Sequence, residues 1–72
     1  MDNTKEENFK RLAEKRTQKI IDTLQLLGNL SNTSNYSYTD KQVEHIFGAI
    51  ESELKIQRAK FRKTGNKKSF KL

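Results

Sequence analysis

The sequence predicts an all-α fold: an antiparallel two-helix hairpin that dimerises into a four-helix bundle and carries a flexible basic C-terminal tail. Two stretches repeat apolar residues at steps of three and four, which is the spacing of one helix face. A segment rich in Asn and Ser separates them, and the chain has no Pro. We expect a hairpin over residues 1–62, with helices at about 5–27 and 40–62 and a loop at 28–39. A disordered tail at 63–72 is expected to follow.

The first helix has signals at both ends. Thr4 and Glu7 have the spacing of a capping box, in which each side chain bonds the other residue's backbone N–H. Gly28 follows the last periodic residue and suits a left-handed C-cap. The expected apolar face consists of Phe9, Leu12, Ala13, Thr17, Ile20, Ile21, Leu24 and Leu27.

The second helix has a stronger start. Thr39 and Gln42 form a second capping-box pattern, and Tyr38 and Val43 have the spacing of a hydrophobic staple. In the preceding segment Asn and Ser compete with helix by bonding their own backbone, which predicts a loop. The expected apolar face consists of Val43, Ile46, Phe47, Ile50, Leu54, the stem of Arg58, and Phe61.

The two apolar faces match in length, which favours antiparallel pairing. The expected layers are Leu27 with Val43, Leu24 with Phe47, Ile20 with Ile50, Thr17 with Leu54, and Phe9 with Phe61. A hairpin this small leaves part of its apolar surface exposed to water, and such scaffolds usually oligomerise. A weaker stripe on the second helix is a candidate dimer interface and consists of His45, Ala49, Ser52 and Ile56. The alternative is an ordinary exposed face that includes one isolated apolar residue, Ile56.

The net charge of +6 lies at one end of the chain. Residues 58–72 hold seven basic side chains and no acidic one, so their charge is +7. The other 57 residues hold eight basic and nine acidic side chains, so their charge is −1. A charge placed in this way is typical of chains that bind a polyanion or an acidic protein surface, because folding does not require it.

The composition argues against several functional classes. Cys is absent and His45 is the only His, so we expect no metal site and no cofactor. No nucleophile has a base and an orienting group at a recognisable spacing, so we expect the chain not to be an enzyme. Neither a signal peptide nor a membrane-length apolar run is present, which predicts a cytoplasmic protein without membrane contact.

Nucleic acid is the leading expected partner, bound through its backbone with low sequence preference. Basic side chains neutralise phosphates, and Phe70, which has no core to join, is placed to stack on bases. A stripe at i, i+4 and i+8 on the first helix adds to the set, although it is also typical of a solvated face. The candidate residues are Arg58, Lys60, Arg62, Lys63, Lys67, Lys68, Lys71 and Phe70, with Arg11, Lys15 and Lys19 on the first helix.

Two other readings of the tail remain. In one, the hairpin is a protein-interaction module, an adaptor or inhibitor that docks on a host protein, and the basic tail binds an acidic groove of that protein. Leu30, Tyr36 and Tyr38 of the loop are its candidate contact residues. Alternatively, the tail is a solubilising end without a target. No helix-turn-helix is predicted, because its turn takes about 3–4 residues and this loop is much longer.

The segments FKRLAEKRTQKII, LLGNLSNTSNYSYT and VEHIFGAIESELK, with the later AKF, carry a resemblance. Over roughly Phe9 to Phe61 the chain resembles a group of short helical proteins, without an assigned activity, from phages and integrative or conjugative elements of Gram-positive bacteria. The group offers no catalytic motif to transfer. The resemblance implies a role in a mobile genetic element: replication, transfer, regulation or interference with a host system.

Overall fold

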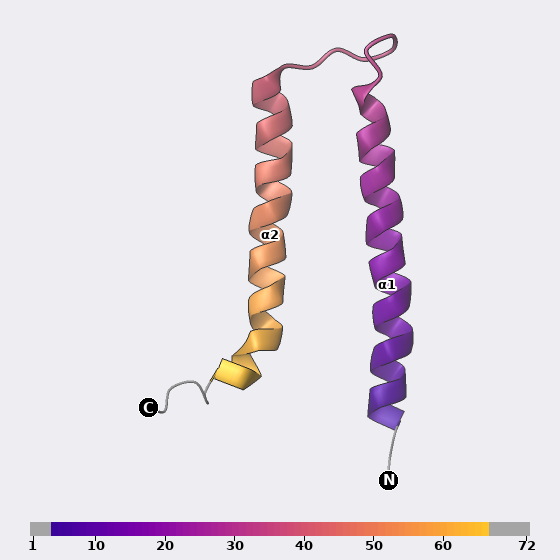
Figure 1. Cartoon of the computed structure of the whole chain (residues 1–72), viewed down its shortest axis with the longest axis vertical. Coiled ribbons are helices and arrows are strands. Elements are labelled where there is room, and N and C mark those ends of the chain that lie inside the picture. Colours follow the sequence, from indigo (N-terminus) through magenta and orange to yellow (C-terminus); the bar gives the residue numbers. More distant parts are fainter. Residues whose placement is uncertain (1–3, 67–72) are drawn as a thin grey trace. The chain divides into compact units, whose positions relative to one another are not determined.

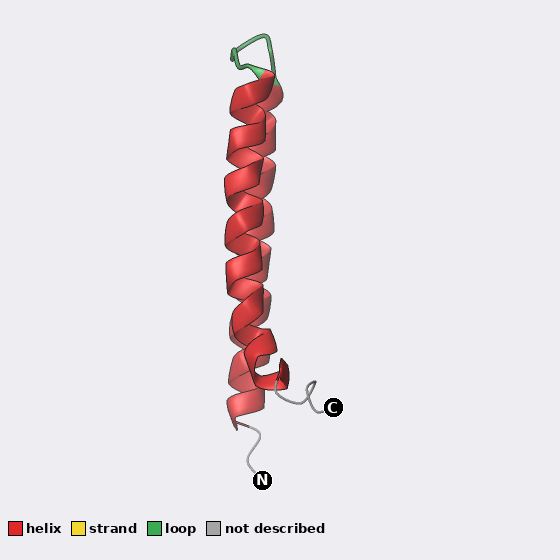
Figure 2. Cartoon of the chain, turned by 90° about the vertical axis from the view of Figure 1, so that its left-hand side faces the viewer, coloured by secondary structure: helices red, strands yellow, loops and turns green. Residues whose placement is uncertain are grey.

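The computed structural model describes the backbone of residues 4–66 and the side chains of residues 4–62. Its elements are helix α1 (Thr4–Gly28), the short 3-10 helix η1 (Asn29–Ser31) and helix α2 (Asp40–Asn66), followed in Figure 1 from indigo to yellow. Figure 2 shows the described chain as helix and loop alone. The predicted all-α class with two helices is confirmed. The chain divides into two units, one ending at Ser37 and one beginning at Tyr38.

The start of α2 is held by the predicted capping box. The backbone N–H of Gln42 donates to Thr39 Oγ1 at 3.1 Å, and the backbone N–H of Thr39 donates to Gln42 Oε1 at 2.9 Å. The first helical bond follows, from the N–H of Val43 to the carbonyl of Thr39 at 3.1 Å. Because the first N–H groups of a helix lack internal partners, these contacts fix where α2 begins.

The end of α1 differs from the prediction. Gly28 is helical, with φ −61° and ψ −28°, so the left-handed C-cap expected there is wrong. The helix instead tightens into η1, and the N–H of Asn32 bonds the carbonyl of Asn29 at 3.3 Å. A 3-10 turn satisfies terminal carbonyl groups without any residue at positive φ, which removes the need for a glycine.

The Asn- and Ser-rich segment forms a defined turn around Asn32. Its side-chain Oδ1 accepts the N–H of Ser34 at 2.9 Å, and its carbonyl accepts the N–H groups of Asn35 and Tyr36 at 3.1 and 3.0 Å. This is the side-chain-to-backbone bonding that makes Asn a turn former. The predicted loop therefore has an internal structure that composition alone did not specify.

The predicted apolar faces are visible in the exposure of the side chains. Among residues 4–62 no side chain is buried, so neither unit has a core of its own. The half-buried side chains within that range all belong to the predicted faces. They are Leu12, Ala13, Leu27, Val43 and Ile50. Other face residues remain exposed, among them Leu24 at 38% and Phe47 at 41%. The two faces thus offer apolar surface for further burial.

Helix α2 continues to Asn66, four residues beyond the expected end at Arg62. Thr64 and Gly65 therefore belong to a helical backbone, although the sequence analysis ended the helix at about residue 62. Basic residues near a helix C-terminus interact favourably with the helix dipole, and Arg62 and Lys63 lie in this region. The remaining residues of the predicted tail, 67–72, lie outside the described residues.

Candidate nucleic-acid interface

The basic end of α2 carries the described part of the predicted interface. Arg58, Lys60 and Arg62 lie on α2, and all three side chains are exposed. Lys63 continues the same helical backbone, but its side chain lies outside the described range. Lys67, Lys68, Phe70 and Lys71 also fall outside the described residues. The structure thus places the first basic residues of the tail on a helix.

The sequence prediction missed Lys55. It is exposed and lies one turn before Arg58, so Lys55, Arg58 and Arg62 follow each other at i, i+3 and i+7 on one side of α2. A signal for it was present, because no acidic residue follows Glu53 anywhere in the chain. The basic segment therefore begins at Lys55 rather than at Arg58.

The acidic residues of α2 lie in its first half and most of its basic residues lie in its second half. From Asp40 to Glu53 the helix holds four acidic residues and Lys41, a charge of −3. From residue 54 to 66 it holds five basic and no acidic residues, a charge of +5. The helix dipole favours this order, since anions stabilise a helix N-terminus and cations its C-terminus. That effect is confined to the terminal turns, whereas the basic segment extends over more than two turns.

The predicted stripe on α1 is a weaker candidate. Arg11, Lys15 and Lys19 are exposed, but the Arg11 Nη2 donates to Asn8 Oδ1 at 3.2 Å. Asp22 lies on the same side one turn after Lys19, and its Oδ1 accepts a bond from Gln18 at 2.9 Å. A carboxylate at the end of the stripe lowers its attraction for phosphates. The stripe is thus more typical of a mixed, solvated face.

The predicted dimer stripe lies on one face of α2. Ile56 is 54% exposed, and the other three residues are also exposed. The stripe has steps of four, three and four residues, so it has the same pattern when read in reverse. Self-association through it stays a prediction. Its members are His45, Ala49, Ser52 and Ile56.

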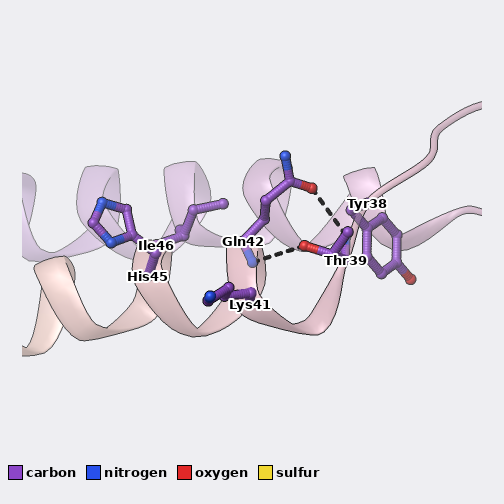
Figure 3. A pocket seen from close by; sticks show the side chains of 6 residues that line it. All are labelled: Tyr38, Thr39, Lys41, Gln42, His45 and Ile46. Carbon is purple, nitrogen blue, oxygen red and sulfur yellow. Dashed lines mark hydrogen bonds between the residues drawn. The ribbon is translucent and has the colours of Figure 1, made fainter.

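An open depression lies along the first turns of α2, around the capping box (Figure 3). The two dashed bonds between Thr39 and Gln42 stand beside it. No side chain in the described range 4–62 is buried, so no polar group is held away from water in this depression. The depression therefore lacks the convergent, desolvated groups of a small-molecule site. Its lining residues are Tyr38, Thr39, Lys41, Gln42, His45 and Ile46.

Neither metal-binding clusters nor a membrane span indicates a second functional site in the described residues. Within the described part of the chain, no cluster of His, Asp or Glu is placed to hold a metal ion. None of the helices as described is long and apolar enough to cross a membrane. Comparison with models of protein families, with curated proteins and with solved structures gave no match to the chain.

Proposed function

We propose that this chain is a small, non-enzymatic accessory protein that binds nucleic acid through its phosphate backbone. The observation that carries this proposal is the basic segment of α2, where exposed cations begin at Lys55 and no acidic residue follows Glu53. Each phosphate that a Lys or Arg neutralises releases condensed counterions, which drives binding at low salt. A role in a mobile genetic element rests on the sequence resemblance alone.

Low sequence preference belongs to the same proposal. Specific reading of bases requires polar side chains that face the base edges, usually in bidentate pairs. From Lys55 to Arg62 the exposed polar side chains other than Gln57 are cations, and Gln57 Nε2 donates to Glu53 Oε2 of the same helix at 2.6 Å. We therefore expect contacts with phosphates to dominate.

The fold proposed for the active form is the antiparallel hairpin. Apolar side chains on α1 and α2 remain exposed when each unit is considered by itself, and burial of such area stabilises a fold by about 25 cal/mol per Å². The layer of Leu24 with Phe47 is the proposed centre of this pairing. It would fix α2 while leaving its basic end accessible.

A second candidate function is a protein-binding adaptor or inhibitor. The observation in its favour is the ordered loop around Asn32, which exposes Leu30 at 45% and Tyr36 at 49%. Tyr is enriched in protein interfaces, because it combines apolar area with a polar tip. In this function the loop supplies the contact residues and the basic end lies in an acidic groove of the partner.

The experiment that tests the proposal is a fluorescence anisotropy titration with labelled oligonucleotides. The intact chain is titrated into single- and double-stranded oligonucleotides at about 50 and about 200 mM salt. The proposal expects micromolar or tighter binding at the lower salt concentration and a large loss at the higher one. Absence of binding at about 50 mM salt would overturn it and leave the adaptor function as the candidate to pursue.

A further inference from the structure

The stripe of His45, Ala49, Ser52 and Ile56 lies on the side of α2 away from the apolar face of that helix. With about 100° of rotation per residue, the four residues fall within an arc of about 60°, almost directly opposite the apolar face. All four side chains are exposed. Pairing of the apolar face with α1 would therefore leave the stripe uncovered.

No charged residue interrupts the stripe. The nearest charged residues within its span are Glu53 and Lys55, which lie about 70° and about 90° from its centre line on opposite flanks. Three cations share the stripe's side of the helix but lie beyond its ends: Lys41, Lys60 and, by its backbone position, Lys63. A partner that packs on residues 45–56 thus buries no charge, which limits the contact to about 17 Å of helix.

The spacing of the stripe matches itself in reverse. Its steps of four, three and four residues place His45 level with Ile56 of a second, antiparallel copy of α2, and Ala49 level with Ser52. The two middle residues are small, so the helices can approach closely, since the distance between packed helix axes depends on the side chains at the contact. A second copy of α2 therefore fits the stripe in one register.

The charges of α2 select the orientation of the second copy. In the antiparallel register, residues 54–61 of one helix, with a charge of +3, lie beside residues 40–47 of the other, with a charge of −1. Parallel pairing would instead place the +3 segment beside its own counterpart. Packed helix axes are about 8–10 Å apart, which is close to the Debye length at physiological salt, so these charges interact across the interface without paired side-chain contacts. Charge complementarity thus favours the antiparallel order.

We propose that the stripe is a docking surface for a second copy of this chain, and that the two α2 helices pair antiparallel with His45 of each level with Ile56 of the other. This inference goes beyond the proposed function and does not depend on it. It gives self-association an orientation and a register. It also assigns a role to the acidic start of α2, which lies beside the cations of the other copy and reduces their mutual repulsion.

The test uses single-Cys variants of the full chain, which has no Cys of its own. His45→Cys and Ile56→Cys are mixed in equal amounts and oxidised without nucleic acid, and mass spectrometry counts the three disulfide-linked dimers. A disulfide needs Cα atoms about 4.4–6.8 Å apart, whereas antiparallel pairing separates like positions by about 17 Å along the axis. The proposal expects the mixed dimer to exceed either same-variant dimer roughly fivefold or more. A predominance of same-variant dimers would show parallel pairing and overturn it.

A matched control pair separates docking on the stripe from random collision. Glu44→Cys and Gln57→Cys are also level in the antiparallel register, but they lie about 110° from the centre line of the stripe on opposite flanks. We expect a much lower yield of their mixed dimer. Equal yields for the two pairs would overturn the proposal, as would the absence of any linked dimer. Ala49→Cys with Ser52→Cys keeps both ends of the stripe intact and should favour the mixed dimer by a smaller factor, because like positions are then only about 4.5 Å apart along the axis.

Discussion

Thr39 and Gln42 satisfy each other's backbone at the start of α2, with reciprocal bonds of 3.1 and 2.9 Å between side-chain oxygen and backbone N–H. Both residues are exposed, so the pair stabilises the helix through bonding rather than through burial. Its effect is local: it fixes the first turn of α2 and hence which residues follow on each face. In a chain whose described side chains include none that is buried, such terminal bonds have more weight than in a large domain.

Replacement of Thr39 by Ala is predicted to lower the free energy of unfolding by about 1 kcal/mol, the usual cost of losing an N-cap side chain. Urea denaturation followed by far-UV circular dichroism measures the change. Thr33→Ala removes a hydroxyl from the loop and is the matched control, expected to change stability by less than about 0.5 kcal/mol. Equal effects of the two substitutions would contradict the role of the capping box.

Gly28 gives a prediction whose sign depends on its backbone conformation. Its φ is −61°, and a Cβ placed on it would meet nothing within 4 Å. Gly28→Ala is therefore predicted to raise the free energy of unfolding by roughly 0.5–1 kcal/mol, because Ala loses less conformational freedom than Gly. Gly28→Asn should stabilise less than Ala, since Asn has lower helix propensity. A left-handed residue would reverse that order, with Asn better tolerated than Ala, and denaturation of both variants decides between the two conformations.

The turn at Asn32 is testable at one atom. Asn32→Asp keeps the oxygen that accepts the N–H of Ser34, whereas Asn32→Ala removes it. Amide hydrogen exchange measured by NMR should show faster exchange at Ser34 in the Ala variant and little change in the Asp variant. Equal exchange rates in both variants would mean that the side-chain bond does not order the turn in solution.

Whether a sequence prediction was confirmed depended on how far apart in the chain the residues of its pattern lie. The capping box at Thr39 needs residues only three positions apart, and the prediction was confirmed in atomic detail. The end of α1 was predicted wrongly, because a glycine after a helix suits both a left-handed cap and a further helical turn. In this structure α1 continues into a 3-10 turn, which ends with the bond from the backbone N–H of Asn32 to the carbonyl of Asn29. Lys55 was missed because the basic tail was defined as the dense run of Lys and Arg from Arg58 onward, without regard to which residues precede that run on the same side of the helix.

The hairpin is tested by a double-mutant cycle between Leu24 and Phe47. Phe47→Ala alone is predicted to cost about 3–5 kcal/mol if the side chain is buried by α1. The pair should show a coupling energy above about 0.5 kcal/mol, because contacting residues are not additive. Leu24 with Leu54 is the matched control pair: both belong to the apolar faces, but the proposed layers keep them about 10 Å apart, so additivity is expected. Additive effects for Leu24 and Phe47 would contradict the proposed layers.

Self-association through the stripe around Ile56 is tested by Ile56→Glu. Sedimentation velocity without nucleic acid should show a dimer for the unchanged chain and a monomer for the variant, because burial of an unpaired carboxylate is costly. Ile56→Val keeps the apolar surface and is expected to remain a dimer. If the Glu variant also remains a dimer, the interface lies on another face.

The most direct test of the central claim compares two triple variants in the DNA anisotropy titration. Arg58, Lys60 and Arg62 are changed to Gln in one, and Arg11, Lys15 and Lys19 in the other. Both variants lose three positive charges, so their net charge is matched. The account predicts that the α2 variant lowers the slope of log K against log salt by about 2–3 and that the α1 variant changes it less. Equal losses in both variants would show that net charge alone sets the affinity and would contradict a binding segment at the end of α2.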